Sequence, residues 1–523
     1  MAQAGLFRAL FDCRVVLRTL RSLASLVAYA STDQLIDVRL EYDDLASDLK
    51  AIPTADSAVE LVRWAEERER AVYAKLDSLA GDASADLPLH VRFESVLWLQ
   101  SVRFSRGGKQ IAPRRLLMID DLQKLRKKQR ELMLEELVEL RPAIPVWLAE
   151  RSIALGDALL SQGAREGRDL RHYPIEEMWS GKSQQQFATF AQSILDRRLD
   201  VQREIPAGAF SQYLEDQLTS EDLMDLFGKA VENFDKEMER HRGNIRYAEW
   251  LAHADEAQKT MGFDSLMQLY LTRILVARSE GRRQLTLELA PLPAEELDER
   301  DSKVLGAAEI FCHDDLKLPY YYGVDRLCAL ATTNVEELLA IAASLYEGML
   351  AKQVLRKQPD LRLSPAEQER RIKETAKRKR DFIPKSHTEG TRAQRLLDAI
   401  AQYCRDKTFQ MSASYAPGVT GIRLSRYELS RLRPEQTKNS ELHALLARVL
   451  WECVAENLLT TRPSAASTSR DEGTVFYLNR SFCAHHDLPL QYGGWQDVSA
   501  ETLINWMDGP SAQTKRRSAE VPR

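Results

Sequence analysis

The sequence lacks the cysteine patterns of disulfide-bonded secreted domains and the long apolar runs of membrane-spanning helices. Its six cysteines, at positions 13, 312, 328, 404, 453 and 483 of 523, show no C-x-x-C spacing. Such scattered cysteines argue against a disulfide framework or a zinc site and fit a reducing cytosol. No apolar run approaches the ~18–20 residues that a membrane-spanning helix needs. We therefore expect a cytoplasmic protein with no membrane partner.

An excess of one charge sign and the common hydrolytic motifs are also lacking. The 73 Lys and Arg residues against 78 Asp and Glu residues give a formal net charge of −5, so any nucleic-acid surface must be local. The chain has no G-x-S-x-G and no H-E-x-x-H, which leaves nucleophilic and metal-dependent hydrolysis without support. His485 and His486 stand apart from other ligand types, which favours a role in a turn.

The most informative run is R-L-L-M-I-D-D-L over residues 115–122. Four apolar residues followed by Asp120 and Asp121 predict a buried parallel strand whose C-terminal tip presents carboxylates. This is the Walker B pattern of P-loop nucleotide hydrolases, in which the first acid helps to hold Mg²⁺ and the second polarises the attacking water. The alternative is an ordinary strand of a parallel sheet that ends in two acids by chance.

A Walker B strand needs a phosphate loop, normally on an earlier strand, with the pattern G-x-x-x-x-G-K-[ST]. No such pattern precedes Asp120. The later tripeptide Gly181-Lys182-Ser183 does not supply one, because Glu176 occupies the place of the first glycine. We expect a helix start there, with a serine as the cap.

A helix and a second strand are expected directly after the acid pair. The helix should run from about residue 127 to 140, where Pro142 stops it, and residues 144–149 predict the next buried strand. Strand, helix and strand form a βαβ unit with a parallel sheet and the acids at its carboxyl edge. In AAA-type ATPases the neighbouring strand ends in a polar sensor, for which the candidates are Glu150, Arg151 and Ser152. The alternative is an ordinary βαβ turn.

The rest of the chain is expected to be mainly helical. An amphipathic helix over residues 1–29 precedes a polar helical hairpin over 33–51 and 55–79, and a segment that could be a helix end or a strand covers 97–104. Helices dominate from about 188 to 350, and 361–385 is a charged linker or helix. The C-terminal region reads as helices over 394–407, 425–431 and 441–458, then strands over 459–462 and 474–478. Helices that end in a two-stranded ribbon are the outline of a winged helix-turn-helix.

Basic residues in and before this C-terminal region are candidates for binding double-stranded DNA. Phosphate contacts need Lys and Arg, which supply affinity without sequence information. The alternative for the basic stretch is a solvated helical face. Acids at 441, 452 and 456 would face a duplex poorly, so the region could equally serve protein contacts. The candidates are Lys377, Arg378, Lys379, Arg380, Arg423, Arg426, Arg431, Arg433, Lys438 and Arg448.

Taken in order, residues 116–121, 144–151, 320–336, 476–483 and 488–495 resemble the bacterial Orc1/Cdc6-like branch of AAA ATPases. The resemblance implies an ATPase core, a helical lid and a winged helix. It also implies ATP and Mg²⁺ as cofactors, with Asp120 as the Mg²⁺ ligand and Asp121 as the group that activates water. Two departures stand out. The phosphate loop of the family would lie before the point where this chain begins, as in an N-terminally truncated form. Glu336 occupies the place of a lid arginine that touches the γ-phosphate, and an acid there repels phosphate.

We therefore predict an α/β, mostly helical fold, and we leave three functions open. Its expected parts are an incomplete AAA-type parallel-sheet core over 1–180, a helical lid over 181–355, a charged connector over 356–385, a winged-helix-like domain over 386–508 and a disordered tail over 509–523. One function is a DNA-associated, ATP-driven switch. Another is a nucleotide-independent adaptor that binds DNA and a protein partner or a second copy of itself. The third is a protein-interaction module with no DNA binding. The missing phosphate loop and Glu336 favour nucleotide independence.

Overall fold

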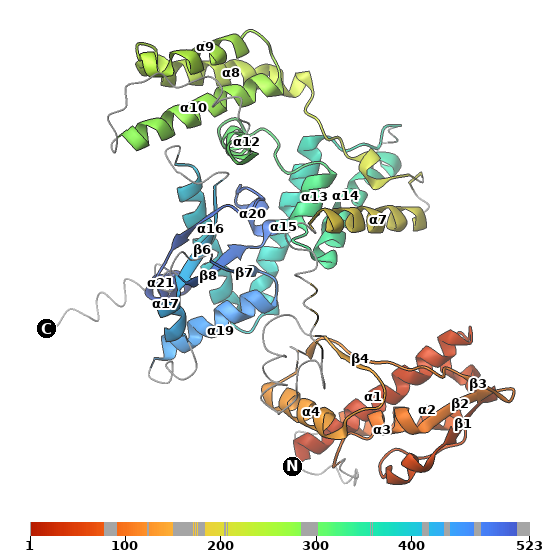
Figure 1. Ribbon diagram of the computed structural model, residues 1–523. Helices are drawn as coiled ribbons and strands as arrows, with labels where there is room; N and C mark the ends of the chain where they lie inside the picture. The colour runs from red at the N-terminus through yellow and green to blue at the C-terminus, as the bar shows by residue number, and fades with distance from the viewer. Residues whose placement is uncertain are drawn as a thin grey trace. The chain divides into compact units, whose positions relative to one another are not determined.

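The computed structural model describes residues 2–77, 91–122, 125–149, 184–202, 205–206, 208–283, 302–355, 359–410, 418–432, 440–464 and 472–509, with single positions at 171, 173, 175 and 357. The chain divides into two compact units, Met1–Tyr173 and Pro174–Arg523, and each is described by itself (Figure 1). Several expectations fall outside the described residues: those for Glu150, Arg151, Ser152, Gly181, Lys182, Ser183, Arg433, Lys438 and the tail after 509.

The core of the first unit forms between two long helices, α1 (Ala2–Leu26) and α2 (Ala58–Asp77). Apolar residues of α1 recur at helical spacing, and Leu20 and Leu23 are buried against the second helix's apolar face. The buried carboxylate of Asp12 accepts hydrogen bonds from the backbone nitrogens of Glu94 and Ser95, at 3.1 and 2.9 Å. It thereby satisfies free N–H groups at the start of α3 (Ser95–Ser101).

A three-stranded antiparallel sheet packs into the same core, in the order β1–β2–β3. Its strands are Val38–Tyr42, Val102–Arg106 and Lys109–Ile111. The prediction of a helix over 33–51 was wrong, because this segment holds β1 between two short 3₁₀ helices. Buried Val38 and Leu40 alternate with exposed residues at a period of two, and pairing with β2 outweighs helix propensity. The segment 97–104, for which the sequence allowed a helix end or a strand, contains both: α3 ends and β2 begins within it.

The predicted βαβ unit is present. The strands β4 (Leu117–Ile119) and β5 (Val146–Leu148) pair in parallel, and α4 (Lys127–Leu140) connects them. The expectation that the strands are buried holds for one face only. Leu117 is buried, whereas Met118 and Trp147, which pair across the strands, are 66% and 61% exposed. Because successive side chains point to opposite faces, a helix layer on one side leaves the other apolar face open among the described residues.

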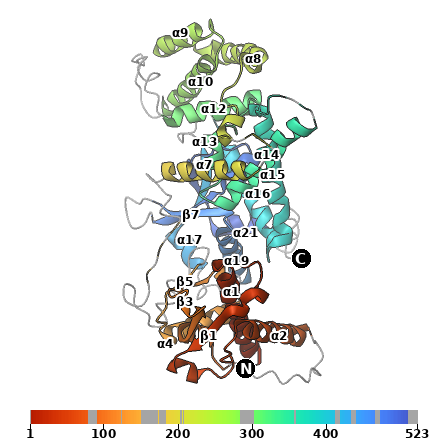
Figure 2. The ribbon, with the colours of Figure 1, turned by 90° about the vertical axis from the view of Figure 1, so that its right-hand side faces the viewer.

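The second unit begins with helices that share one large core. Good caps fix where two of them begin: Thr219 and Asp222 form a capping box at α8, and Ser364 and Glu367 form another at α15. The charged segment expected over 361–385 is mostly the helix α15, which packs against α14 and α16 (Figure 2). The helices are α7 (Gln184–Val201), α8 (Ser220–Met238), α9 (Ala248–Ala257), α10 (Phe263–Arg283), α12 (Ser302–Leu316), α13 (Val324–Leu330), α14 (Val335–Val354) and α15 (Pro365–Ser386).

The C-terminal part of this unit combines helices with a four-stranded sheet in the order β7–β8–β6–β9. The predicted antiparallel ribbon of β7 and β8 is present, whereas β6 and β9 were not foreseen. The strand β6 pairs antiparallel with β8 and parallel with β9. The elements are α16 (Gly390–Thr408), β6 (Val419–Ser425), α17 (Arg426–Arg431), α19 (Glu441–Ala455), β7 (Leu459–Pro463), β8 (Gly473–Leu478), α20 (Arg480–His485), β9 (Gly494–Asp497) and α21 (Ala500–Asp508).

The protein is thus α/β and mostly helical, as the sequence predicts. In the described ranges, no helix combines the length and the apolar character needed to cross a membrane. All six cysteines are buried free thiols.

Candidate functional site

The acid pair lies at the C-terminal tip of β4, as its sequence position predicts. Asp120 is exposed and Asp121 is partly buried, and the backbone nitrogen of Asp121 donates to Oδ1 of Asp120 at 2.7 Å. Asp121 has a φ of 59°, a left-handed conformation that Asp tolerates better than most residues. The next residue, Leu122, is fully buried and its nitrogen donates to the carbonyl of Ala149 at 3.2 Å. A fixed turn therefore presents both carboxyl groups at the carboxyl edge of the two strands.

The two carboxyl groups fit one part of a Mg²⁺–nucleotide site. Mg²⁺ in phosphate-transfer sites is usually held by one or two carboxylates, with phosphates and water as its other ligands. Among the described residues, no group of three His, Cys, Asp or Glu side chains is placed to hold a metal. The sequence does not fit the phosphate-binding part of such a site, because its 523 residues contain no G-x-x-x-x-G-K-[ST]. We therefore derive no ATP hydrolysis step from this geometry.

The first turn of α14 places its two adjacent acids, Glu336 and Glu337, in different surroundings. Asn334 caps α14, and its Oδ1 accepts from the backbone nitrogens of Glu336 and Glu337 at 2.8 and 3.4 Å. Glu336, at the position where the resemblance expects an arginine, is exposed. Glu337 turns inward, and only 10% of its side chain is exposed. The first turn of α14 therefore carries one outward carboxylate and one that is committed to the interior of this unit.

Glu337 joins α14 to α15 and to the C-terminal region. Its Oε1 accepts from Lys379 Nζ at 2.7 Å and from the side-chain amides of Asn457 and Asn479, each at 2.9 Å. Its Oε2 accepts from the hydroxyl of Ser481 at 3.1 Å. Sequence reasoning missed this cluster, and no spacing rule could have found it, because the partners lie 42 to 144 residues away along the chain.

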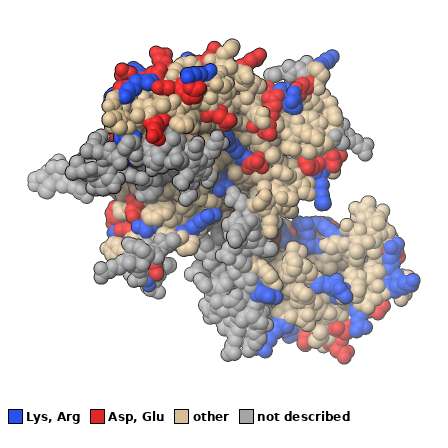
Figure 3. Space-filling model, turned by 45° about the horizontal axis from the view of Figure 1, so that its top comes forward, with Lys and Arg blue, Asp and Glu red and all other residues tan. Residues whose placement is uncertain are grey.

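Most of the basic residues proposed to bind DNA are engaged in ion pairs within their own unit. Arg380 contacts Asp398 at 2.6 Å, Arg423 contacts Asp497 at 2.8 Å, and Arg426 contacts Glu472 at 3.1 Å. Lys379 is held by Glu337, Arg431 by Glu428 and Glu501, and Arg448 lies 4.0 Å from Glu389. Both signs of charge are interspersed over the face in Figure 3. Among the described candidates, most of the positive charge is therefore balanced by a neighbouring carboxylate.

Two of these candidates are exposed on α15. Lys377 and Arg378 form no ion pair with any residue in the described part of the chain. The other described candidates would have to leave their carboxylates, or bring them close to the phosphate, before they could contact DNA. Exposed ion pairs contribute only about 0–1 kcal/mol each, so exchange of partners is feasible but gives little net gain.

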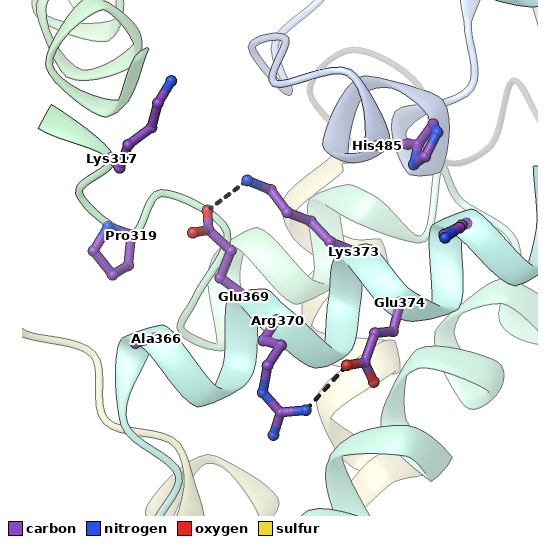
Figure 4. Close-up of a pocket in the computed structure, with 9 residues that line it drawn as sticks. Lys317, Pro319, Ala366, Glu369, Arg370, Lys373, Glu374 and His485 are labelled. Carbon is purple, nitrogen blue, oxygen red and sulfur yellow. Dashed lines mark hydrogen bonds and ion pairs between the residues drawn. The ribbon is translucent and has the colours of Figure 1, made fainter. Parts of the chain in front are cut away.

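A pocket of about 500 Å³ opens beside α15 (Figure 4). Two of its cations are paired within the lining: Arg370 pairs with Glu374 at 3.0 Å, and Lys373 lies 3.7 Å from Glu369. Lys373 is also 2.6 Å from Asp487. Burial lowers the pKa of His485 below its ordinary value, and nearby His486 and Arg380 add to this effect. The lining carries four Lys or Arg side chains against two Glu side chains, so the pocket has a modest positive excess, which Asp487 beside Lys373 reduces. Its lining residues are Lys317, Pro319, Ala366, Glu369, Arg370, Lys373, Glu374, Lys377 and His485.

The outer face of α19 is mixed rather than basic. It carries Trp451, which is 44% exposed, together with exposed Glu441 and Arg448. Leu442 lies on the opposite side of the helix, in line with buried Leu446 and Val449. Arg448 is the one basic residue of α19. A helix that reads DNA presents polar and basic side chains to a groove, so this face suits contact with protein better than with bases.

Together the features describe a mostly helical α/β protein with an acid pair after a parallel strand and a C-terminal helix–sheet region. The chain belongs to the ORC-CDC6-like family, whose model matches residues 2–494 and so extends over both units. No curated protein and no solved structure matches the chain.

Proposed function

We propose that the protein is a DNA-associated adaptor of the ORC-CDC6-like family that acts without hydrolysing nucleotide. The observation that carries this proposal is the order of the C-terminal elements within a chain of that family. Helix α16, strand β6, helices α17 and α19, and the ribbon β7–β8 follow one another, and β6 pairs with β8. This order supports a winged-helix domain, a fold that docks on duplex DNA. The buried thiols of all six cysteines support a cytoplasmic location.

Two features support an adaptor rather than an ATP-driven switch. The chain has no G-x-x-x-x-G-K-[ST], and an exposed carboxylate at Glu336 would repel a γ-phosphate. In a nucleotide-bound state, Asp120 would serve as a Mg²⁺ ligand and Asp121 would orient water, and Mg²⁺ would supply charge neutralisation. The proposed adaptor role does not depend on that state.

The test measures binding of the full chain to a fluorescent duplex, with and without Mg²⁺ and ATP. We expect binding at low salt that weakens steeply as salt rises, because phosphate contacts release counterions. The affinity should be the same with and without ATP. A shift of tenfold or more with ATP would support the switch instead, and absence of binding at low salt would rule out DNA association.

One observation favours a second function, a protein-interaction module without DNA binding. The large apolar side chain of Trp451 is 44% exposed on the outer face of α19, where a DNA reader would need polar groups. The two functions differ in a simple measurement. Trp451→Ala should leave duplex affinity unchanged if α19 contacts protein, and should weaken it if α19 enters the groove.

A further inference from the structure

The hairpin formed by β2 and β3 in the first unit has a tight, open tip. Arg106 and Lys109 face each other across a two-residue turn, Gly107–Gly108. Both glycines have positive φ values, 56° and 74°, as two-residue hairpin turns of the favoured type require. No atom lies within 4 Å of a Cβ built on either glycine, so the tip projects into open space. Another molecule's backbone could therefore approach the tip closely.

Exposed cations surround this hairpin. Arg39 and Arg103 lie on the face of the sheet opposite buried Leu40 and Phe104, Lys109 lies at the tip, and Arg114 follows β3. Within the described ranges, these four residues form no ion pair, whereas neighbouring Arg106 pairs with Asp37 at 2.6 Å. We call Arg39, Arg103, Lys109 and Arg114 the hairpin cations.

Two acids, Glu41 and Asp37, lie beside the hairpin cations, fewer than the cations themselves. Glu41 is opposite Arg103 in the register, and its Oε1 accepts from the hydroxyl of Ser105 at 3.0 Å. Asp37 is hydrogen-bonded to Tyr29 and Arg106. The hairpin therefore keeps a positive surplus, unlike the paired cations of the C-terminal region, which would have to give up a carboxylate before meeting a phosphate.

We propose that the β2–β3 hairpin is a second DNA-contacting element, whose cations bind the phosphate backbone of a duplex. The inference rests on the proposed function and deepens it by naming a surface outside the winged-helix region. Contacts to the phosphate backbone need Lys and Arg that no carboxylate already holds. Because β1 pairs with β2 along its whole length, the hairpin is the edge of a three-stranded sheet, and its cations would meet phosphates at the surface of the duplex. The glycine tip lets this edge approach the sugar–phosphate backbone without steric hindrance.

The test replaces three hairpin cations in the full chain: Arg103→Gln, Lys109→Gln and Arg114→Gln together. Each lost phosphate contact should make the negative slope of log affinity against log salt shallower by about 0.9. The slope of the triple variant should therefore be shallower than that of the wild type by up to about 2.7. A matched control removes three exposed lysines from the second unit, Lys229→Gln, Lys236→Gln and Lys259→Gln. A charge-conserving triple, Arg103→Lys, Lys109→Arg and Arg114→Lys, shows whether the strands tolerate substitution.

The expected result is a shallower slope for the hairpin triple alone, with wild-type slopes for the control and the charge-conserving triple. Equal slopes for the hairpin triple and the wild type would overturn the inference while leaving the proposed function standing. An equal loss in the control triple would also overturn it, because net charge alone would then explain the effect. A wild-type chain that binds no duplex at low salt would overturn the proposed function, and this inference with it.

Discussion

The Oε1 atom of Glu337, at the start of α14, lies 2.7 Å from Nζ of Lys379 on α15. The same carboxylate accepts from Asn479 and Ser481, which flank the start of α20. One mostly buried acid thus ties two long helices to the C-terminal region. An adaptor needs such a joint if binding at one end is to hold the other end in a fixed orientation.

Glu337→Ala should destabilise this unit strongly. The change leaves a lysine and two amide groups without their common acceptor, and breaking a mostly buried polar cluster typically costs about 2–4 kcal/mol. Glu347→Ala, an exposed position on the same helix, should change the free energy of unfolding by less than about 0.5 kcal/mol. Urea unfolding followed by circular dichroism measures both variants. Similar values for the two would show that Glu337 is not a joint.

Two glycine substitutions should have opposite effects on stability. Gly108 has a φ of 74°, so Gly108→Ala forces a Cβ into the left-handed region and should cost about 1 kcal/mol. Gly228 lies inside α8 with open space around it, so Gly228→Ala should gain about 0.5–1 kcal/mol. Thermal unfolding of both variants checks the signs. Stabilisation by Gly108→Ala would contradict the turn geometry on which the hairpin proposal depends.

The local elements were the easiest part of the fold to predict. The βαβ unit was found because an apolar run, two acids and a proline give its elements clear bounds. The segment with β1 was misread as helix, because its strand is stabilised by β2, more than 50 residues later. The strands β6 and β9 were missed, since β6 is held by pairing with β8 and β9, and β9 by pairing with β6, all distant from each other along the chain. Long-range pairing cannot be read from local periodicity.

The candidate site was predictable only in part. The positions of Asp120 and Asp121 at a strand tip follow from their sequence, and the structure adds the left-handed turn. The basic residues near the C-terminus could be counted from the sequence, but their ion-pair partners could not be predicted. These partners come from other elements, as Asp497 does for Arg423. No sequence motif indicated the hairpin cations, because Arg39 and Arg103 come together only through the pairing of β1 with β2.

Stability should depend on pH through Asp487. Burial raises the pKa of this carboxyl, but hydrogen bonds from His313 and Lys373 outweigh burial and hold the pKa well below its usual value near 3.9. The guanidinium of Arg405 lies 3.4 Å from the same carboxylate, and Glu369 is the nearby acid. A depressed folded-state pKa means that the carboxylate stabilises the fold above about pH 4 and loses this effect as the pH falls further.

Asp487→Asn removes that dependence while keeping a residue that tolerates its φ of 56°. The variant should be less stable than the wild type at pH 7, and the difference should shrink between about pH 4 and pH 2. Urea unfolding at a series of pH values measures it. A constant difference across that range would mean that the carboxylate does not act through its charge.

Asp121→Asn should leave duplex binding unchanged within about twofold. The substitution removes the proposed water-orienting group, and Asn accepts the same left-handed conformation, so the turn after β4 should persist. Fluorescence anisotropy with and without Mg²⁺ and ATP compares it with the wild type. A loss of affinity that appears only when ATP is present would connect the acid pair to DNA binding.

The most direct test of the account is the affinity of the full chain for a duplex across about 50 to 200 mM salt, measured with and without Mg²⁺ and ATP. Contacts to about four to six phosphates predict a slope of log affinity against log salt near −4 to −5, the same in both conditions. A flat salt dependence, or an affinity that requires ATP, would contradict a nucleotide-independent protein that holds DNA by its phosphates.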